Sequence, residues 1–389
     1  MNNKAIWMAF VIVIATFWIF PNTNSSLNGY PVASFSFEIN GYNVTFNASS
    51  SYDEDGIIVN YTWDFGDGSI GYGEKTQHEY AEEGIYGVCL IVVDNDDKSN
   101  STCNNVTIDL TPPTTSYNLI PLPNGKNGWC ISNIIVQIVA NDSISGVKNT
   151  YYKIDGNWVS YSNPILIEED GIYEIKFYSI DNSNNVEDTK IVEIKIDKTP
   201  PFTTFNSSLP PKNGWYNKIV KISLQPTDNL SGIYKLYYRL DGGTYKEYEN
   251  NITVGEGRHL LEYFAIDIAG NAEKLKRQDI KVDVTPPEAI LSPSKGIYLF
   301  GRKIVSSDAT TIIGNVTIKV EGQDNLSGIN KVEFYIDGNL KAEDNSTPYE
   351  WQWEEFAIGK HEIKTIVYDA AGNRAILREE VFIFNPKWG

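Results

Sequence analysis

Clustered oxygen-bearing side chains are the residues of this sequence best suited to chemistry. Asn47, Ser49, Asp53, Asp55 and Asp64 place hard oxygen donors in one short part of the chain, and Asp53 opens a D-x-D-G turn. Calcium takes roughly six to eight oxygen ligands, and backbone carbonyls or waters can complete such a set. The sequence therefore predicts a calcium site at these five residues. In the alternative interpretation, the same side chains only form Asx-turn hydrogen bonds.

Catalytic arrangements are missing from the sequence. Only three His and three Cys occur in 389 residues, and His259 and His361 align with Tyr173 of another repeat, which indicates a structural position. The adjacent pairs Glu168-Glu169 and Glu354-Glu355 would point to opposite sides of a strand, so neither pair can act as acid and base. No G-x-S-x-G, H-E-x-x-H, P-loop or G-x-G-x-x-G context is present. We therefore expect no catalytic residues and a protein that is not an enzyme.

The composition favours strands and an acidic surface. Asp and Glu number 50 against 32 Lys and Arg, which gives a net charge of -18. Such a surface repels nucleic acid and anionic membrane faces, so neither is expected as a partner. Aromatic residues make up 13% of the chain, and Tyr alone occurs 24 times. Together with many Ile, Val, Thr and Asn, this content is typical of strands joined by turns.

The N-terminus indicates export. Residues 5–20 are almost wholly apolar, Lys4 precedes them, and Pro21 and a polar run follow. This pattern is that of a signal peptide, but no A-x-A cleavage site follows it. A retained anchor helix is the open alternative, in which case residues 5–20 are the only membrane contact. The rest of the chain is expected outside the cell or on its surface.

N-x-S/T sequons agree with an extracellular address. They are in clear excess over chance, which predicts a glycosylated surface, although Asn-rich turns inflate such a count. The sequons start at Asn24, Asn43, Asn47, Asn60, Asn100, Asn105, Asn141, Asn206, Asn229, Asn251, Asn315, Asn325 and Asn345.

Three internal repeats follow the first 110 residues. Each begins with Thr-Pro-Pro, at Thr111, Thr199 and Thr285, two residues after an Asp. Each then carries a D-x-[IL]-S-G segment, an Asp-Gly pair thirteen residues after the Asp of that segment, and a closing D-x-x-[NG]-N segment. The matching acids are Asp142, Asp228 and Asp324 in the first segment and Asp181, Asp267 and Asp369 in the last. Three landmarks in three copies indicate one repeated fold, and the repeat acids could form further calcium sites at the domain junctions.

Hydrophobic residues alternate with polar ones between these landmarks. Runs such as 134–139, 219–224 and 316–320 mix β-branched and polar residues and end in Gly, Asn or Asp turns. Short alternating strands about ten residues apart predict β-sandwiches. We therefore expect an all-β protein with four tandem Ig-like sandwiches after an N-terminal apolar helix. The predicted segments are a signal or anchor with its linker (1–30), a first domain (31–110), and repeats 1, 2 and 3 (111–197, 198–283 and 284–389).

The first domain resembles a PKD domain, the immunoglobulin-like module of archaeal surface-layer proteins and secreted hydrolases. The resemblance lies in the run from Ser51 to Gly56, the motif Trp63-Asp-Phe-Gly-Asp-Gly68 and the stretch from His78 to Asp94, in that order. It implies that Trp63 and Tyr86 are core residues. It also supports the calcium prediction, because PKD domains of secreted collagenases carry calcium at the matching turn.

The repeats resemble bacterial Ig-like modules of multi-domain surface proteins. The segment from Tyr237 to Asn271 is similar to repeats named for a leptospiral outer-membrane protein, and 152–185 is a weaker copy. The segment 346–373 is closer to the general bacterial Ig-like type. Repeat 1 departs from the pattern with Asn184 where the other repeats have Gly. The resemblance implies extended, non-catalytic modules at a cell surface.

The cysteines predict one disulfide. Val88, Leu90 and Val92 should face the core, so Cys89 faces outward, and Cys103 lies symmetrically across the turn near Asp96. Cross-strand neighbours have Cβ atoms about 5 Å apart, and an exported protein meets an oxidising environment. We expect a Cys89–Cys103 bond, with two free thiols as the alternative. Cys130 is expected to be unpaired.

These patterns together predict an exported, non-catalytic surface protein that acts as an extended structural or adhesive stalk. Its partners would be extracellular proteins or glycans, and calcium is the one expected cofactor. In the alternative, the chain is an accessory polysaccharide-binding portion of a secreted hydrolase. Exposed rings such as Trp158 and Tyr245 would stack on sugars in that case, although sandwich core or strand edges are the simpler positions for them.

Overall fold

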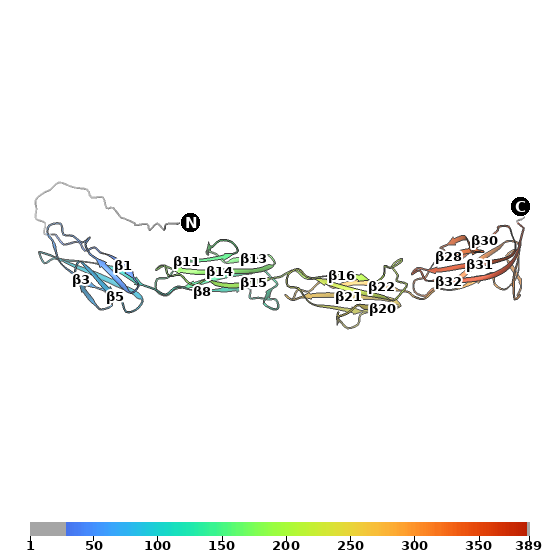
Figure 1. Cartoon of the computed structure of the whole chain (residues 1–389), viewed down its shortest axis with the longest axis horizontal. Helices are drawn as coiled ribbons and strands as arrows, with labels where there is room; N and C mark the ends of the chain where they lie inside the picture. Colours follow the sequence, from blue (N-terminus) through green and yellow to red (C-terminus); the bar gives the residue numbers. More distant parts are fainter. Residues whose placement is uncertain (1–28, 387–389) are drawn as a thin grey trace, which may run out of the picture. The chain divides into compact units, whose positions relative to one another are not determined.

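The computed structural model describes residues 29–386, which form strands, turns and loops (Figure 1). The expectation of an all-β protein with sheets of the sandwich type is confirmed. The apolar helix expected at residues 5–20 lies outside the described residues. Within 29–386 there is no helix long and apolar enough to cross a membrane.

The first domain consists of two facing sheets, with strand orders β1-β2-β5 and β4-β3-β6-β7. Alternating burial turns one side of each strand inward, and Trp63, Phe46 and Tyr80 are almost fully buried between the sheets. Trp63 is therefore a core residue, as the resemblance implies. The strands are β1 Ser36–Asn40, β2 Asn43–Asn47, β3 Ile58–Asp64, β4 Ile70–Tyr72, β5 Lys75–Glu79, β6 Gly84–Asp94 and β7 Ser99–Ile108.

Repeat 1 contains eight strands. β10 pairs with β13, β11 pairs with β12 and β14, and the short β9 runs parallel to β15. Ile175 and Phe177 of β14 are buried at every second position, as the period-two pattern predicts. The strands are β8 Thr114–Ile120, β9 Trp129–Cys130, β10 Ile134–Asn141, β11 Val147–Ile154, β12 Val159–Ser160, β13 Ile165–Ile167, β14 Gly171–Asp181 and β15 Lys190–Ile196.

Repeat 2 has the strand arrangement of repeat 1 without a strand that corresponds to the short β9. Its sheets have the orders β16-β17-β20 and β19-β18-β21-β22. Ile222, Leu261 and Ile280 are fully buried between them. The strands are β16 Phe202–Ser207, β17 Val220–Thr227, β18 Ile233–Leu240, β19 Lys246–Glu247, β20 Ile252–Val254, β21 Gly257–Asp267 and β22 Lys276–Val282.

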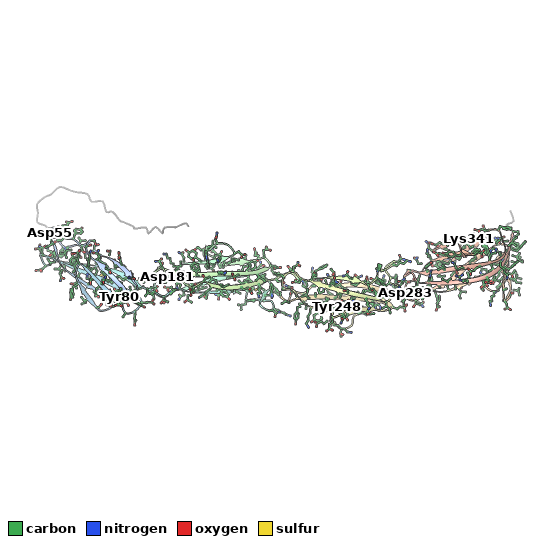
Figure 2. All side chains as sticks on the ribbon, viewed as in Figure 1. Asp55, Tyr80, Asp181, Tyr248, Asp283 and Lys341 are labelled. Atoms are coloured by element: carbon green, nitrogen blue, oxygen red, sulfur yellow. A yellow bond between two sulfur atoms is a disulfide. The ribbon has the colours of Figure 1, made fainter. Side chains whose placement is uncertain are left out.

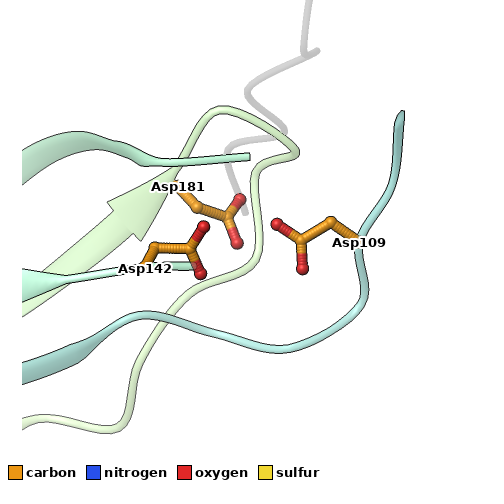
Figure 3. A group of neighbouring side chains, drawn as sticks. All are labelled: Asp109, Asp142 and Asp181. Carbon is orange, nitrogen blue, oxygen red and sulfur yellow. The ribbon is translucent and has the colours of Figure 1, made fainter. Parts of the chain in front are cut away.

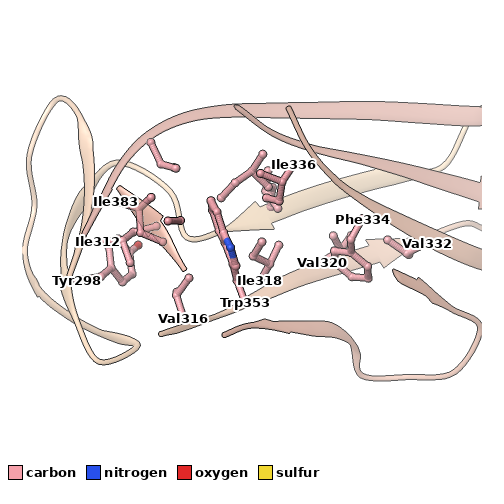
Figure 4. Packing of buried hydrophobic residues seen from close by; sticks show 14 of the residues in the cluster. Tyr298, Ile312, Val316, Ile318, Val320, Val332, Phe334, Ile336, Trp353 and Ile383 are labelled. Atoms are coloured by element: carbon pink, nitrogen blue, oxygen red, sulfur yellow. The ribbon is translucent and has the colours of Figure 1, made fainter. Parts of the chain in front are cut away.

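Repeat 3 is larger because its second sheet is extended. Its sheets are β23-β27-β30 and the seven-stranded β25-β24-β26-β32-β31-β28-β29. Figure 4 shows Trp353, which is 1% exposed, among core residues that include Val316, Ile318 and Ile336. The strands are β23 Glu288–Ser292, β24 Gly296–Leu299, β25 Arg302–Val305, β26 Thr310–Ile313, β27 Val316–Gln323, β28 Ile329–Ile336, β29 Asn339–Asp344, β30 Tyr349–Trp353, β31 Ala357–Asp369 and β32 Arg374–Asn385.

Candidate functional site

Three groups of aspartates, one at the entrance of each repeat, are the strongest candidate site in residues 29–386. In each group, one carboxylate oxygen from each of three Asp residues lies within 4.8 Å of the others. The groups are Asp109, Asp142 and Asp181; Asp197, Asp228 and Asp267; and Asp283, Asp324 and Asp369. Figure 3 shows the first group converging, and Figure 2 labels a member of the first and of the third group, Asp181 and Asp283. We call these groups the junction triads.

One acid of each triad lies in the D-x-[IL]-S-G loop and is held there by backbone N–H groups. In repeat 1, Asp142 Oδ1 accepts hydrogen bonds from the backbone N–H of Ile144 (3.2 Å) and of Gly146 (2.6 Å). Asp228 and Asp324 make the same two bonds in repeats 2 and 3. The loop therefore folds around this carboxylate, which explains the fixed spacing from Asp to Gly.

The second acid ends a long strand and is held by the Asn of the closing segment. Asp267, the last residue of β21, accepts bonds from the backbone N–H of Gly270 and Asn271, and its Oδ2 accepts from Asn271 Nδ2 at 2.8 Å. Asp181 and Asp369 are held in the same way by their own Asn residues.

Repeat 1 forms this closing turn in spite of its different sequence. Asn184 adopts φ 70°, in the left-handed region that Gly270 and Gly372 occupy at φ 104° and 97°. Asn enters this region more readily than other residues with a side chain. The departure that we noted in the sequence therefore leaves the turn intact.

The third acid belongs to the linker and attaches it to the sandwich that follows. Asp197 Oδ2 accepts from the backbone N–H of Ser231 at 3.1 Å, and its backbone carbonyl accepts from Asn271 Nδ2 at 2.8 Å. The same pair of bonds connects Asp109 to repeat 1 and Asp283 to repeat 3. Sequence reasoning noted these Asp residues beside Thr-Pro-Pro but did not assign them to a site.

The triads gather negative charge that a cation could neutralise. The linker and strand-end acids are at most 5% exposed, and the loop acids are half-buried. No ion pair among the described residues includes any of the nine carboxylates. Burial, followed by the neighbouring charge of Asp197, raises the pKa of Asp267, and burial and Asp283 raise the pKa of Asp369 in the same way. Buried charges are normally paired or bound to a metal, and three carboxylates are ligands that a hard divalent cation prefers.

A second contact joins repeats 1 and 2, and a similar one joins repeats 2 and 3. The Asn-Gly-Trp hairpin of repeat 1 places Lys126 N 2.8 Å from Ala269 O and Asn127 Nδ2 3.2 Å from Ile268 O. In repeat 2, Asn213 Nδ2 donates to Ala370 O at 3.1 Å. The hairpin tryptophans Trp129 and Trp215 are 7% and 6% exposed. The two tryptophans are therefore buried beside the junction and do not form an exposed binding surface.

The five residues of the predicted calcium site in the first domain have mostly local partners. Asn47 Oδ1 accepts from Ser49 N (3.0 Å) and Asp64 Oδ1 accepts from Gly66 N (2.9 Å), as the Asx-turn alternative describes, while both Asp55 oxygens accept from Gly29 N. Among the described residues, the carboxylates of Asp53, Asp55 and Asp64 do not converge as the triads do.

Asp53 is the member of this set that keeps an unused oxygen. Its Oδ1 is buried without a hydrogen-bond partner. Burial raises the pKa of Asp53, and the charges of Asp55 and Asp94 add to this effect. A calcium site in the first domain remains a prediction centred on Asp53.

The cysteines have the arrangement that the hairpin argument describes. Cys89 and Cys103 lie opposite each other in the β6–β7 register and are joined by a disulfide. Cys130 is a buried free thiol, and burial raises its pKa.

His259 and His361 occupy structural positions at the start of the long strands. His259 Nδ1 lies 2.8 Å from an oxygen of Asp241, and His361 Nδ1 lies 2.6 Å from Asp337. At the matching position of repeat 1, Tyr173 donates its hydroxyl to the backbone carbonyl of Glu169 at 3.0 Å. A position that accepts either His or Tyr, each bonded to its own repeat, fastens the start of the long strand.

Repeats 1 and 2 also carry matching aromatic groups. In repeat 1, Tyr151 and Tyr178 stack at 5.4 Å between ring centroids, Trp158 meets Tyr178 at 4.7 Å, and Lys153 Nζ lies 4.9 Å from the Trp158 ring centre. In repeat 2 the corresponding residues are Tyr237, Phe264, Tyr245 and Arg239. Trp158 is 37% and Tyr245 40% exposed. In repeat 3, the two positions that carry the stacked rings in the other repeats are occupied by Glu333 and Ile366, which are paired in the strand register.

Comparisons with known protein families agree with this architecture. Residues 28–109 match the PKD domain, and residues 303–365 match the bacterial Ig domain. The chain thus carries an N-terminal PKD domain and a C-terminal bacterial Ig-like domain. Both matched modules are of types that are typically non-catalytic.

Curated relatives match only through a small part of their length. A microbial collagenase of Vibrio alginolyticus is 40% identical over 68 residues, 18% of this chain and 8% of the relative. Collagenase ColQ1 of Bacillus cereus (strain Q1) is 43% identical over 65 residues, 17% of this chain and 7% of the relative. The chain therefore spans less than a tenth of the length of these collagenases. Among solved structures, the PKD1 domain of Vibrio anguillarum Epp is 32% identical and covers 21% of this chain and 98% of its own, with a TM-score of 0.21.

Proposed function

We propose that the chain is an exported, non-catalytic stalk that holds an adhesive or structural contact away from the cell surface. The observation that carries the proposal is the linker aspartate, whose side chain and carbonyl are bonded into the following sandwich in all three repeats. A linker fastened in this way cannot swivel freely, and the two prolines after each Asp stiffen it further. A repeated, fastened linker suits a spacer and has no evident use in a catalytic domain.

Calcium bound at the junction triads is the second part of this proposal. Each triad offers three carboxylates from three segments: the linker, the loop and the strand end. An ion held by all three would join the linker to the sandwich more strongly than the hydrogen bonds alone. It would also neutralise buried charges that otherwise repel one another.

Differential scanning calorimetry of the full chain in calcium and in chelator tests the ion. Binding to the folded state alone adds about 2.7 kcal/mol at a hundred times the dissociation constant, so the repeat transitions should move to higher temperature in calcium. In Asp228→Asn, the amide oxygen can still accept from Leu230 and Gly232, but one charge of the triad is lost. The calcium shift of repeat 2 should therefore disappear.

Asp279→Asn is the matched control, because Asp279 is an exposed acid on β22 of the same repeat. It should keep the full calcium shift. Equal midpoints in calcium and chelator for the unmodified chain would contradict calcium binding and would leave only hydrogen bonds at the junctions.

Polysaccharide binding as an accessory portion of a secreted hydrolase is the second candidate. The matching aromatic groups of repeats 1 and 2 favour it, because exposed ring faces pack on the apolar faces of sugars. The full chain should then co-sediment with insoluble cellulose, chitin or cell-wall glycan. The double variant Trp158→Ala and Tyr245→Ala should release it, whereas Tyr234→Ala, an exposed ring outside both groups, should not. A chain that binds none of these glycans is a spacer only.

A further inference from the structure

The extended sheet of repeat 3 presents an apolar outer face. Along β24, β26 and β32, residues alternate between the core and solvent: Tyr298, Ile312 and Ile383 are at most 8% exposed and are seen in the core in Figure 4. Their neighbours on each strand point to the opposite side of the sheet. These outer residues, which we call the outer patch, are Ile297, Leu299, Val305, Ile313, Ile358, Phe382 and Phe384, each 36–51% exposed.

The strand registers align the outer patch into rows. Leu299 is opposite Ile313, Ile313 is opposite Phe384, and Phe384 is opposite Ile358, so four strands contribute one continuous apolar row. In the next row, Ile297 and Phe382 flank Thr311 in the same register. Cross-strand partners have Cβ atoms about 5 Å apart, so these side chains touch and form one surface.

The outer patch is specific to repeat 3. The corresponding sheet of repeat 2 ends at β22, whereas repeat 3 continues past β32 with β26, β24 and β25. In repeat 2, Lys281 is paired with Arg258, and the matching pair in repeat 3 is Phe382 with Lys360. Added strands and a Lys-to-Phe replacement at an outward position create an apolar surface that the fold itself does not need.

The size of the outer patch is that of a protein interface. Its seven residues together expose about as much surface as three whole side chains, roughly 600 Å² at about 200 Å² each. The largest apolar patch of a typical monomer is about 300–600 Å² and is often functional. A stable interface buries about 800 Å² on each partner, which this patch and its rim can supply.

We propose that the outer patch is the contact through which two copies of this chain associate, sheet against sheet. Apolar sheet faces pack against each other about 10 Å apart, so the best complement to this flat face is another one like it. The rim carries both signs of charge: Lys360 lies next to Phe382, and Glu380 is the next outward residue of β32. In a two-fold contact, residues near the axis meet their own counterparts, whereas rim residues meet different residues of the other copy, so a Lys of one copy can face a Glu of its partner.

Sedimentation equilibrium of the full chain tests this contact with two matched variants. Phe384 and Ile376 both point outward on β32 and are 44% and 46% exposed, but only Phe384 belongs to the outer patch. The unmodified chain and Ile376→Lys should form the same dimer. Phe384→Lys buries an unpaired charge in the centre of the contact and should raise the dimer dissociation constant by at least about 100-fold. Association through residues 5–20 would be the same in all three proteins.

If Phe384→Lys does not fold, cross-linking of two cysteine variants tests the contact instead. Copies of Ile313→Cys should be joined by a short bis-maleimide, and copies of Ile376→Cys should not. The proposal would be overturned if the unmodified chain, Ile376→Lys and Phe384→Lys were all monomeric, or if all three associated equally. A monomer that co-sediments with phosphatidylcholine vesicles, and loses this in Phe384→Lys, would also overturn it by assigning the outer patch to a lipid surface.

Discussion

Asn271→Ala is the substitution that tests the fastening of the linker most sharply. The Asn271 amide donates one hydrogen bond to the backbone carbonyl of Asp197 and one to Oδ2 of Asp267, both at 2.8 Å. Alanine removes both donors, while the backbone N–H of residue 271 can still donate to Asp267 Oδ1. The change therefore isolates the side-chain link between strand end and linker.

The expected loss of stability follows from the burial of both acceptors. Asp197 is 1% and Asp267 0% exposed, so neither acceptor regains water easily. A hydrogen bond to a charged group contributes about 1.5–3 kcal/mol, and a buried acceptor left unsatisfied costs about 1–3 kcal/mol. We expect a total near 3 kcal/mol. In a domain of this size, 1 kcal/mol corresponds to about 4–8 °C, so the repeat 2 transition should fall by about 15 °C.

Differential scanning calorimetry of the full chain measures this fall. Asn250→Ala is the control, because Asn250 is exposed in the loop before β20 of the same repeat and should change the transition by less than about 0.5 kcal/mol. A fall for Asn271→Ala no larger than that of the control would refute the idea that this amide fastens the linker.

Three further predictions concern the first domain and the core of repeat 3. Burial raises the pKa of Asp67, but hydrogen bonds from Ser69 and His78 outweigh it and bring the pKa down to about 2. The stability that the ionised carboxylate contributes is therefore present above pH 3.8 and is lost as the pH falls toward 2. Acid unfolding of Asp67→Asn should lack that loss. Reduction of the Cys89–Cys103 bond, with a separation of 14 residues, should lower the stability of the first domain by about 3 kcal/mol, measured by urea unfolding with and without dithiothreitol; an unchanged midpoint would contradict this. Trp353→Ala should destabilise repeat 3 by about 3–5 kcal/mol in the same assay, and a loss below about 1 kcal/mol would show that its pocket collapses around the smaller residue.

Local patterns were enough to predict most of the architecture. Period-two alternation and fixed turn residues set the strands of the repeats, because each strand must bury one face and each landmark Asp folds its own loop. For the same reason, two acids of each junction triad, such as Asp228 and Asp267, were expected at domain junctions. The third acid, Asp197, was not assigned to them, because the path of the linker depends on contacts with Ser231 and Asn271 far along the chain.

Features that depend on the register between strands far apart in the chain could not be predicted from local sequence patterns. The outer patch exists because β26 runs parallel to β32 and aligns Ile313 with Phe384, a pairing of segments about 70 residues apart. The first domain shows the same limit of local patterns. Asp53, Asp55 and Asp64 are close in sequence, but Asp64 turns to its own loop at Gly66, so nearness along the chain does not by itself bring all three carboxylates together, and the calcium site there stays a prediction.

Small-angle X-ray scattering of the chain in calcium and in chelator is the most direct test of the stalk. A compact protein of 389 residues has a radius of gyration near 21 Å. If the linkers are fastened and stiffened as proposed, four sandwiches joined end to end should exceed 100 Å in length, and the radius of gyration in calcium should be near 40 Å, on the order of twice the compact value. Chelator should broaden the distribution of interatomic distances as the junctions loosen. A radius near 21 Å in calcium would contradict the account, because it would show sandwiches folded back on one another.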